Sequence, residues 1–522
     1  MGQVKLTAGE HGLLLCLAAG LSLAAPTSGN AAPLYDTRTG GLGLVGAASA
    51  HPASFLYNPA ALGLQPGRLV ATHLDGTIRL GHGSLSRGPI DTLTGQPTSS
   101  AGATVKSFDE ATWLEAFPQP LLSLSSSLGS DTVVVCLSGH TAQTAHLDFL
   151  RGNGKWFDGG IQGPTRYVAS ELTQYHLFGT LATSWRVAEF LIIGASTSLV
   201  WGSLDLAFVR DTALDGGSAR DPATEPVALD DCGAGAPCNY ESDEAAEATR
   251  VRGSAWGLGF ALGFVVRPHP QLDVGLAYVS RVLGFGSSAL TTRGDAWVRR
   301  SQAVYLNALA DPNLDPVDRD LKGRSSVTYS LPDAINFGAT LRLTRRWLLD
   351  LQLRWINYSV FDRLSVRLSG SAFRRDPPVP ERLDHHRGFQ DVWAVQLGGA
   401  YRVRDNLELQ SAMMVETSAV PAESVTPVTV DSTKLDLLLA MAWHVGRYVT
   451  LRAGYSLAWM PRVNQAISTF SPSAMVNCVD ARFDVDVRDC KAASEGRGLP
   501  TTAGTYSLLS HHLGTSVTFH LQ

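Results

Sequence analysis

The sequence is poor in charge and has no long apolar run beyond its first residues. Charged residues make up 17% of its 522 residues, against about 25% in an average soluble protein. The net charge of −5 gives no reason to expect a nucleic-acid partner. After the N-terminal leader no window of 18 or more apolar residues occurs, so no transmembrane helix is expected. An exported chain of this kind is either soluble or a closed β-barrel, because only these satisfy the backbone polar groups in their solvent.

Motifs of common catalytic and cofactor sites are missing as well. Neither a Gly-x-Ser-x-Gly nucleophile elbow nor a His-Glu-x-x-His zinc motif occurs, and we expect no enzyme. Residues 41–46 match Gly-x-Gly-x-x-Gly, but His51-Pro52 follows shortly after, where a dinucleotide site needs a helix. The carboxylates between residues 230 and 244 match no calcium-loop spacing. The sequence therefore predicts neither a cofactor nor a metal site.

The N-terminus has the pattern of a secretory signal peptide. Lys5 precedes a short apolar core at residues 12–21, and Gly29-Asn30-Ala31 resembles a small-residue cleavage site. We expect residues 1–31 to be the signal peptide, with cleavage near Ala31.

Four of the six cysteines form two local pairs in polar loops. Cys232 lies close to Cys238, and Cys478 lies close to Cys490. In an oxidising compartment both pairs are candidate disulfides. A zinc site is the weaker alternative, because no Cys-x-x-Cys or paired histidine spacing accompanies them.

From Arg68 onward the main pattern is an alternation of apolar and polar residues. In the segment from Trp347 to Asn357, Leu349, Leu351 and Leu353 share one face while Asp350 and Gln352 take the other. A period of two places successive side chains on opposite faces of a strand. About fourteen such runs occur, at residues 68–81, 117–128, 131–142, 166–185, 189–207, 251–267, 270–286, 325–343, 347–368, 389–403, 406–418, 433–445, 448–461 and 504–521.

Short and long connections alternate strictly between these runs. Turns of two or three residues follow every second run, as at 129–130, 186–188 and 446–447, and long polar segments such as 208–250 and 462–503 follow the others. An outer-membrane barrel has this arrangement: short periplasmic turns, long outer loops, an even strand number and an apolar outer face. We therefore predict an all-β fold, a 14-stranded antiparallel transmembrane β-barrel formed by residues 68–522.

Aromatic residues lie near the ends of several runs. Trp185, Trp201, Trp347, Trp443 and Trp459 suit the aromatic girdles of an outer-membrane barrel. Ordinary packing between strands is the alternative explanation.

Residues 32–67 are rich in Gly and Ala and do not alternate. A barrel of this size has a lumen wide enough to hold a plug. We expect this segment to fold back into the lumen as a small N-terminal hatch. Asn58-Pro59 favours a turn, and residues 60–63 allow one helical turn that ends at a glycine.

The whole mature chain resembles the long-chain fatty-acid transporter family of the Gram-negative outer membrane (FadL/TodX-type, OMPP1). The similarity begins in the glycine-rich residues 40–50 and peaks at residues 57–62, with the Asn-Pro-Ala motif in that context. Residues 163–167 resemble the family's entry to strand four, and residues 332–361 resemble its mid-barrel hairpin.

The resemblance implies a plugged barrel that catches a hydrophobic ligand at the outer face, passes it to an interior site and releases it sideways through the wall. Asn58, Pro59 and Ala60 then hold and release the hatch. Arg166 and Arg354 are candidates to pair with a ligand carboxylate, and a solvated lumen or rim charge is the alternative for both.

The expected function is therefore uptake of hydrophobic molecules, either long-chain fatty acids or related hydrocarbons, in the outer membrane of a Gram-negative bacterium. The implied partners are this hydrophobic small molecule, outer-membrane lipid and the outer-membrane barrel assembly machinery, and the chain is expected to be a monomer. The alternative is a surface barrel that transports nothing and binds a partner through its long loops.

Overall fold

The computed structural model describes most of the barrel wall and part of the N-terminal segment. The described residues are 43–65, 70–91, 105–106, 111–114, 117–142, 145–148, 165–212, 243, 245–310, 318–361, 363–375, 378–386, 388–465, 470–471, 476–477 and 502–521. The cysteines at 232, 238, 478 and 490 lie outside the described residues, so the disulfide prediction stays a prediction.

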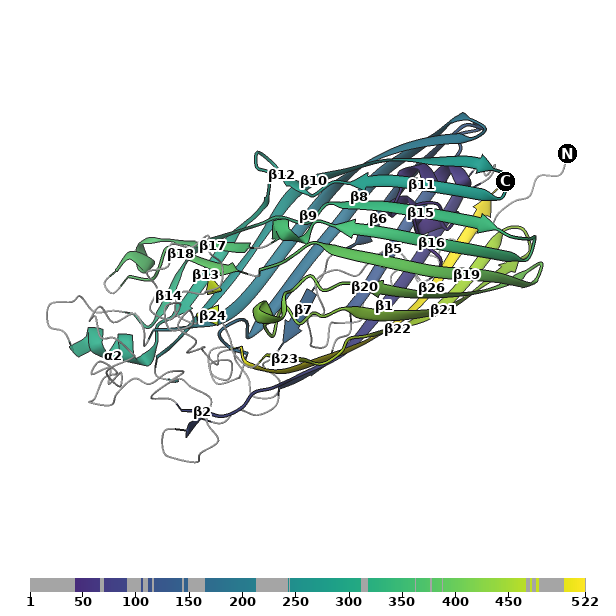
Figure 1. Cartoon of the computed structure of the whole chain (residues 1–522). Coiled ribbons are helices and arrows are strands. Elements are labelled where there is room, and N and C mark those ends of the chain that lie inside the picture. The colour runs from purple at the N-terminus through teal and green to yellow at the C-terminus, as the bar shows by residue number, and fades with distance from the viewer. Residues whose placement is uncertain are drawn as a thin grey trace, which may run out of the picture.

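The wall is a closed antiparallel barrel of fourteen strands, which confirms the predicted fold class. Strand β1 (Val70–Ser86) pairs along its length with the last strand, β26 (Gly504–Leu521), from Val70 opposite Leu521 to Ser86 opposite Thr505. On its other side β1 pairs with β5 (Phe117–Ser126). Figure 1 shows the resulting wall, in which the first and last strands lie side by side. Closure removes the free edges that an open sheet would expose.

Seven of the fourteen strands are continuous. They are β1 and β26 together with β8 (Glu171–Ala188), β9 (Leu191–Asp211), β10 (Ala246–His269), β20 (Leu407–Glu416) and β21 (Lys434–Val445). Each of the other seven is divided into segments that follow one another along the same strand. These are β4 (Ala111–Leu114) followed by β5; β6 (Val133–Thr141) followed by β7 (Ala145–Asp148); β11 (Leu272–Val279) followed by β12 (Leu283–Gly284) and β13 (Leu290–Arg299); β14 (Asp320–Tyr329) followed by β15 (Ala334–Arg342); β16 (Trp347–Ile356) followed by β17 (Arg363–Ser369); β18 (Arg382–His386) followed by β19 (Val392–Arg404); and β22 (Val449–Trp459) followed by β23 (Val463–Gln465).

The remaining elements are short. They are two small hairpins, β2 (Ile90–Asp91) with β3 (Val105–Lys106) and β24 (Phe470–Ser471) with β25 (Val476–Asn477), the 3-10 helices η1 (Pro52–Leu56), η2 (Pro59–Leu64), η3 (Tyr358–Phe361), η4 (Ser371–Arg374) and η5 (Ala422–Ser424), and α2 (Gln302–Ala310). None of the helices in the described part of the chain is long and apolar enough to cross a membrane.

The alternation read from the sequence is realised as an apolar outer face. On β10, Trp256, Leu258, Phe260 and Leu262 are all exposed. The side chains between them point inward, as the buried Ala261 shows. A wall that is apolar outside is the arrangement that a lipid environment requires.

The wall extends further at the long-loop end than the sequence predicted. Residues 287–324 lie between the runs expected at 270–286 and 325–343, yet they contain β13, α2 and the start of β14. Strand β10 has 24 residues, whereas about 9–11 suffice to cross the bilayer. The strands therefore continue well beyond the membrane, and the polar residues of this part face water rather than lipid.

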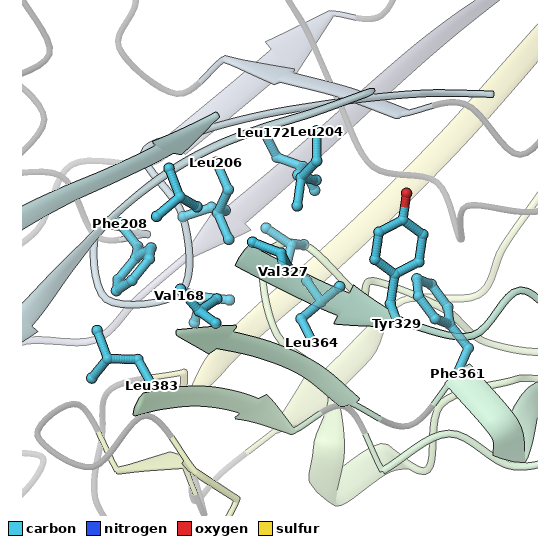
Figure 2. Close-up of a cluster of buried hydrophobic side chains, with 14 of the residues drawn as sticks. Val168, Leu172, Leu204, Leu206, Phe208, Val327, Tyr329, Phe361, Leu364 and Leu383 are labelled. Atoms are coloured by element: carbon cyan, nitrogen blue, oxygen red, sulfur yellow. The ribbon is translucent and has the colours of Figure 1, made fainter. Parts of the chain in front are cut away.

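A large apolar cluster fills the long-loop half of the lumen. Figure 2 labels ten of its members, from Val168 and Leu172 through Tyr329 and Phe361 to Leu383. They come from the inward faces of β8, β9, β14, β17 and β18 and from the segments beside these strands. The described part of this half thus has an extensive packed apolar interior, which also holds the buried ion pair of Arg210 with Glu247.

Candidate functional site

Residues 43–65 lie inside the barrel near the end with the short turns. Figure 1 shows the helical turns η1 and η2, in dark purple, surrounded by the wall. Each turn begins with a proline, after His51 and Asn58 respectively, and each preceding side chain accepts a hydrogen bond from the backbone two residues on. Proline suits this first position because its missing N–H has no partner there in any helix. The expected helical turn after Asn58 is therefore present, as η2.

Asn58 is fully buried and joins the plug segment (residues 43–65) to the wall. Its Nδ2 donates to the carbonyl of Ala47 (2.7 Å) within the segment and to the carbonyl of Phe264 on β10 (3.0 Å). Its Oδ1 accepts from the backbone N–H of Ala60 (3.0 Å). One amide side chain therefore fixes two parts of the plug segment and one strand together.

Glycines in the wall allow this close approach. A Cβ on Gly194 would overlap the backbone of Ala60, and a Cβ on Gly263 would overlap Oδ1 of Asn58. On the next strand, a Cβ on Gly275 would overlap the carbonyl of Ala47. Gly194 and Gly263 are register partners on β9 and β10. Together with Gly275 they form a surface without side chains, here called the glycine seat, against which the plug segment packs.

Long polar side chains from other strands also hold the plug segment. Gln352 on β16 accepts from the N–H of Ala47 (2.9 Å), and Gln410 on β20 accepts from the N–H of Leu44 (3.0 Å). Asn336 on β15 donates to the carbonyl of Tyr57 (2.9 Å). Strands β15 and β16 are paired neighbours and β20 lies two strands beyond β16, so together with the Asn58 contact on β10 the segment is attached along one continuous part of the inner wall, from β10 to β20.

His51 faces the wall at His73, with the two rings edge to face at 5.8 Å. Burial lowers the pKa of His51 well below 6.5, and the charges of Arg452 and His73 lower it further. Its Nδ1 accepts from the N–H of Ala53 (3.2 Å). His51 is therefore neutral in the packed plug segment.

A cavity of about 120 Å³ lies against the plug segment within the lumen. Phe55, Leu56 and Tyr57 form its plug side, and the guanidinium of Arg354 lies over the Tyr57 ring at 5.4 Å. The rest of its lining comes from seven other parts of the chain: His140 and Ala142, Phe178 and Thr180, Ser196 and Ser198, Gly259 to Ala261, Val279 with Ser280 and Val282, Pro332 and Ala334, and Ile356 and Tyr358. Val282, Ala334 and Ile356 also belong to the apolar cluster of the outer half, so the cavity and that cluster are continuous.

Among the described residues, the pairing between the second and third strands stops beside this cavity. Strand β5 pairs with β6 from Ser126 opposite Val135 only as far as Leu121 opposite His140. Just beyond lie Pro118 and Pro120, which have no N–H to donate to a ladder. Within the described residues β7 pairs only with β8. The cavity-lining His140 therefore stands where the pairing of the wall ends.

The predicted site residues fall into two separate places. Asn58, Pro59 and Ala60 lie in the plug segment, and Arg354 lies beside them at the cavity. Arg166 is buried near the long-loop end, where it bonds Asp243 (3.2 Å) and Tyr167 (3.0 Å), and it does not line the cavity.

The glycine seat and the break in the wall were missed from the sequence. The alternating prolines within the run 117–128 were a usable indication, because prolines in a sheet are confined to edges and bulges.

The closed antiparallel barrel with an apolar outer face is the architecture of an outer-membrane β-barrel. A family model described as "Outer membrane protein transport protein (OMPP1/FadL/TodX)" matches residues 156–487. The chain belongs to this family, and its location is the outer membrane.

Related proteins agree with this assignment. The chain is 22% identical to a long-chain fatty acid transport protein of Salmonella typhi over 67% of this chain and 75% of that protein. It is 21% identical to a putative outer membrane protein of Neisseria meningitidis over 40% of this chain, and the match spans only 43% of that protein.

Solved structures share the fold. A Pseudomonas aeruginosa FadL homologue aligns with a TM-score of 0.66 at 13% identity, over 92% of this chain and 100% of that one. The P. putida toluene transporter TodX aligns with a TM-score of 0.58 at 14% identity, over 93% and 99%. At such identities the likeness establishes the fold alone.

Proposed function

We propose that this chain takes up small hydrophobic molecules across the outer membrane through its plugged barrel. The observation that carries the proposal is the cavity between Tyr57 of the plug segment and the inner wall, continuous with the apolar cluster of the outer half. A hydrophobic solute that follows this path avoids both the lipid head groups and bulk water. The similar proteins named for fatty acid and toluene transport support the same class of cargo.

The size of the cavity favours a compact cargo in the closed state. A cavity of about 150 Å³ lined by apolar side chains binds benzene in another protein, and the volume here is about 120 Å³. One aromatic ring, or the end of an alkyl chain, fits that space. A long fatty acid would also need to extend into the apolar cluster or to displace the plug segment.

Arg354 gives the cavity one cationic end. Among the described residues its guanidinium has a ring contact with Tyr57 and no carboxylate within ion-pair distance. A carboxylate at that position would gain a bidentate, charge-assisted pair. We propose Arg354 as the residue that orients a carboxylated cargo. Arg166, whose guanidinium already bonds Asp243, is the weaker candidate for the same role.

We further propose that cargo leaves sideways, through the interrupted wall between β5 and β6. His140 and Ala142 line the cavity and stand where the pairing of the wall ends. A cargo released there enters the apolar part of the membrane and does not need to cross the periplasmic end, which the plug segment covers. In this scheme Asn58, Pro59 and Ala60 hold the plug segment and free it when cargo arrives. The chain acts as a monomer that the barrel assembly machinery inserts.

The test is uptake of labelled toluene and of a labelled long-chain fatty acid by cells that lack other transporters of this class. Cells that produce the full chain are compared with cells that carry no barrel and with cells whose barrel lacks residues 33–60. We expect the full chain to raise uptake, and the deletion to abolish selectivity or to make the barrel leaky to small polar solutes. Equal uptake with and without the full chain would support a surface barrel that transports nothing.

A further inference from the structure

A row of arginines crosses the outer face of the barrel above the membrane. Arg293 on β13 lies opposite Ser326 on β14, and Ser326 lies opposite Arg367 on β17. Arg367 in turn lies opposite Arg382 on β18. Neighbouring strands are about 4.8 Å apart, so these three guanidinium groups occupy one short stretch of wall. Figure 1 shows β13, β14, β17 and β18 together at the end of the barrel opposite the end of β26.

Two of the three charges in this row, those of Arg293 and Arg367, have no partner among the described residues, whereas Arg382 forms an ion pair with Asp384 at 2.6 Å. Further out on the same pair of strands, Arg324 faces Asp295 in register and bonds it at 2.8 Å. By contrast, Arg293 and Arg367 form no hydrogen bond or ion pair with any residue that the structure describes. Arg367 lies opposite Arg382, and because Asp384 already pairs with Arg382, the uncompensated charges of the row are those of Arg293 and Arg367. An anion from outside the chain would compensate these two charges.

The arginines surround a real depression in the surface. A groove of about 790 Å³ is lined by five arginines and a single glutamate, together with serine hydroxyls. Arg324 and Arg374 complete the set, and their side chains are 76% and 74% exposed. Guanidinium groups pair with phosphate oxygens in a bidentate manner. Serine hydroxyls can donate to the same oxygens.

The position of the groove shows what kind of anion can reach it. On β10, the exposed Trp256 ends the apolar outer stripe, and two residues further on Ser254 lies opposite Arg293. The exposed Phe285 lies nearby, after β12. Aromatic side chains of this kind mark the level of the lipid head groups. The groove therefore begins within one or two residues of the head-group level, at the long-loop end that faces the outside.

We propose that this arginine groove, formed around Arg293, Arg367 and Arg382, binds the phosphate groups of a phosphorylated glycolipid of the outer leaflet. The acyl chains of the same lipid lie against the apolar stripe below. The site is on the outer wall, separate from the lumen. It does not depend on what the barrel transports, and it places a lipid beside the broken strands β11 to β13.

The test measures lipid binding to the full-length barrel purified in detergent. Native mass spectrometry counts bound molecules during titration with bisphosphorylated lipid A, with enzymatically dephosphorylated lipid A and with inorganic phosphate. The wild type should retain bisphosphorylated lipid A and bind the dephosphorylated lipid far less. The double variant R293Q/R367Q should weaken binding of the phosphorylated lipid by on the order of tenfold or more, from the loss of two arginines near a charged lipid surface.

Two further variants test whether the loss of binding comes from misfolding or from the removal of any two arginines. R293K/R367K keeps the charge and should retain most of the binding, which distinguishes loss of charge from loss of folding. R345Q/R346Q removes two exposed arginines from the short turn at the opposite end and should bind lipid A as the wild type does. Equal binding of both forms of lipid A would overturn the proposal, as would unchanged binding by R293Q/R367Q. Saturation of the groove by inorganic phosphate alone at the same concentrations would overturn the lipid assignment.

Discussion

The side chain of Asn58 occupies the space in which a side chain on Gly263 would stand. Its Nδ2 reaches the carbonyl of Phe264, the next residue on the same strand, at 3.0 Å. A residue of the plug segment is thus fitted directly against the backbone of the wall. Packing this close depends on the missing Cβ of Gly263 as much as on the amide of Asn58.

The variant Gly263→Ala should therefore loosen the plug segment. The added Cβ would overlap Asn58 Oδ1, and overpacking of this kind costs about 1–3 kcal/mol. We expect a lower free energy of unfolding in urea and a higher single-channel conductance in planar bilayers. The control is Gly76→Ala on β1, where a Cβ would have no atom within 4 Å. If both variants behave as the wild type does, the glycine seat does not hold the plug segment.

Acidification should weaken the packing of the plug segment through His51. Burial keeps its folded-state pKa well below 6.5, whereas the unfolded imidazole titrates near the ordinary value of about 6.5. Below that pH the unplugged state binds a proton that the packed state does not, so stability is lost as the pH falls and is constant above it. Hydrogen exchange of residues 43–65 should therefore be faster at pH 5 than at pH 7.5.

His51→Gln isolates this contribution from that of the neighbouring His73 and Arg452. The variant should show a smaller change in exchange between the two pH values than the wild type. The same pH dependence in both proteins would place the titrating group elsewhere.

Arg354→Gln should distinguish carboxylated from uncharged cargo. A charge-assisted hydrogen bond contributes about 1.5–3 kcal/mol, so binding of a carboxylated aromatic should weaken by roughly tenfold or more. Binding of toluene, which makes no such pair, should change little. Isothermal titration with the two ligands measures the difference, and the matched control is Arg404→Gln at an exposed short turn. An equal loss for both ligands would mean that Arg354 shapes the cavity and does not recognise charge.

Lys434 provides a contrast between buried and exposed ion pairs. Its Nζ lies 2.7 Å from both Glu416 and Asp431, and all three side chains are nearly inaccessible. Lys434→Met would leave two buried carboxylates without their cation, which should cost about 3–5 kcal/mol. Arg324→Met removes the exposed partner of Asp295 and should cost less than about 1 kcal/mol. Urea unfolding of both variants checks the order, and equal losses would contradict it.

Much of the wall could be predicted because a period of two is a local property. The run predicted at 433–445 became β21 (Lys434–Val445), and the run at 448–461 contains β22 (Val449–Trp459). Each strand needs only its own alternation to be recognised, and each short turn joins neighbours. Closure followed from the family resemblance and from the even strand number, and the pairing of β1 with β26 confirms it.

The site could be predicted only in part, because its contacts join residues that are far apart in the chain. Asn58 was identified from its motif, but its partner Phe264 and the space left by Gly263 depend on register across the lumen. The arginine row could not be predicted for the same reason. Arg293 and Arg367 lie near each other only through the register of β13, β14 and β17. The sequence offers no register for strands separated by long loops.

If cargo passes from the cavity through the interrupted wall, a covalent tether across the interruption should block its uptake. In a background without native cysteines, Gln119→Cys with Ala142→Cys joins β5 to the end of β6 just past the last paired residues, Leu121 and His140. Ser123→Cys with Ser138→Cys joins register partners within the paired part of the same strands and is the matched control.

Uptake of labelled toluene is then measured before and after linking with a short bismaleimide. We expect the 119–142 tether to lower uptake several-fold and the 123–138 tether to leave it unchanged. Unchanged uptake with a fully formed 119–142 tether would contradict lateral release.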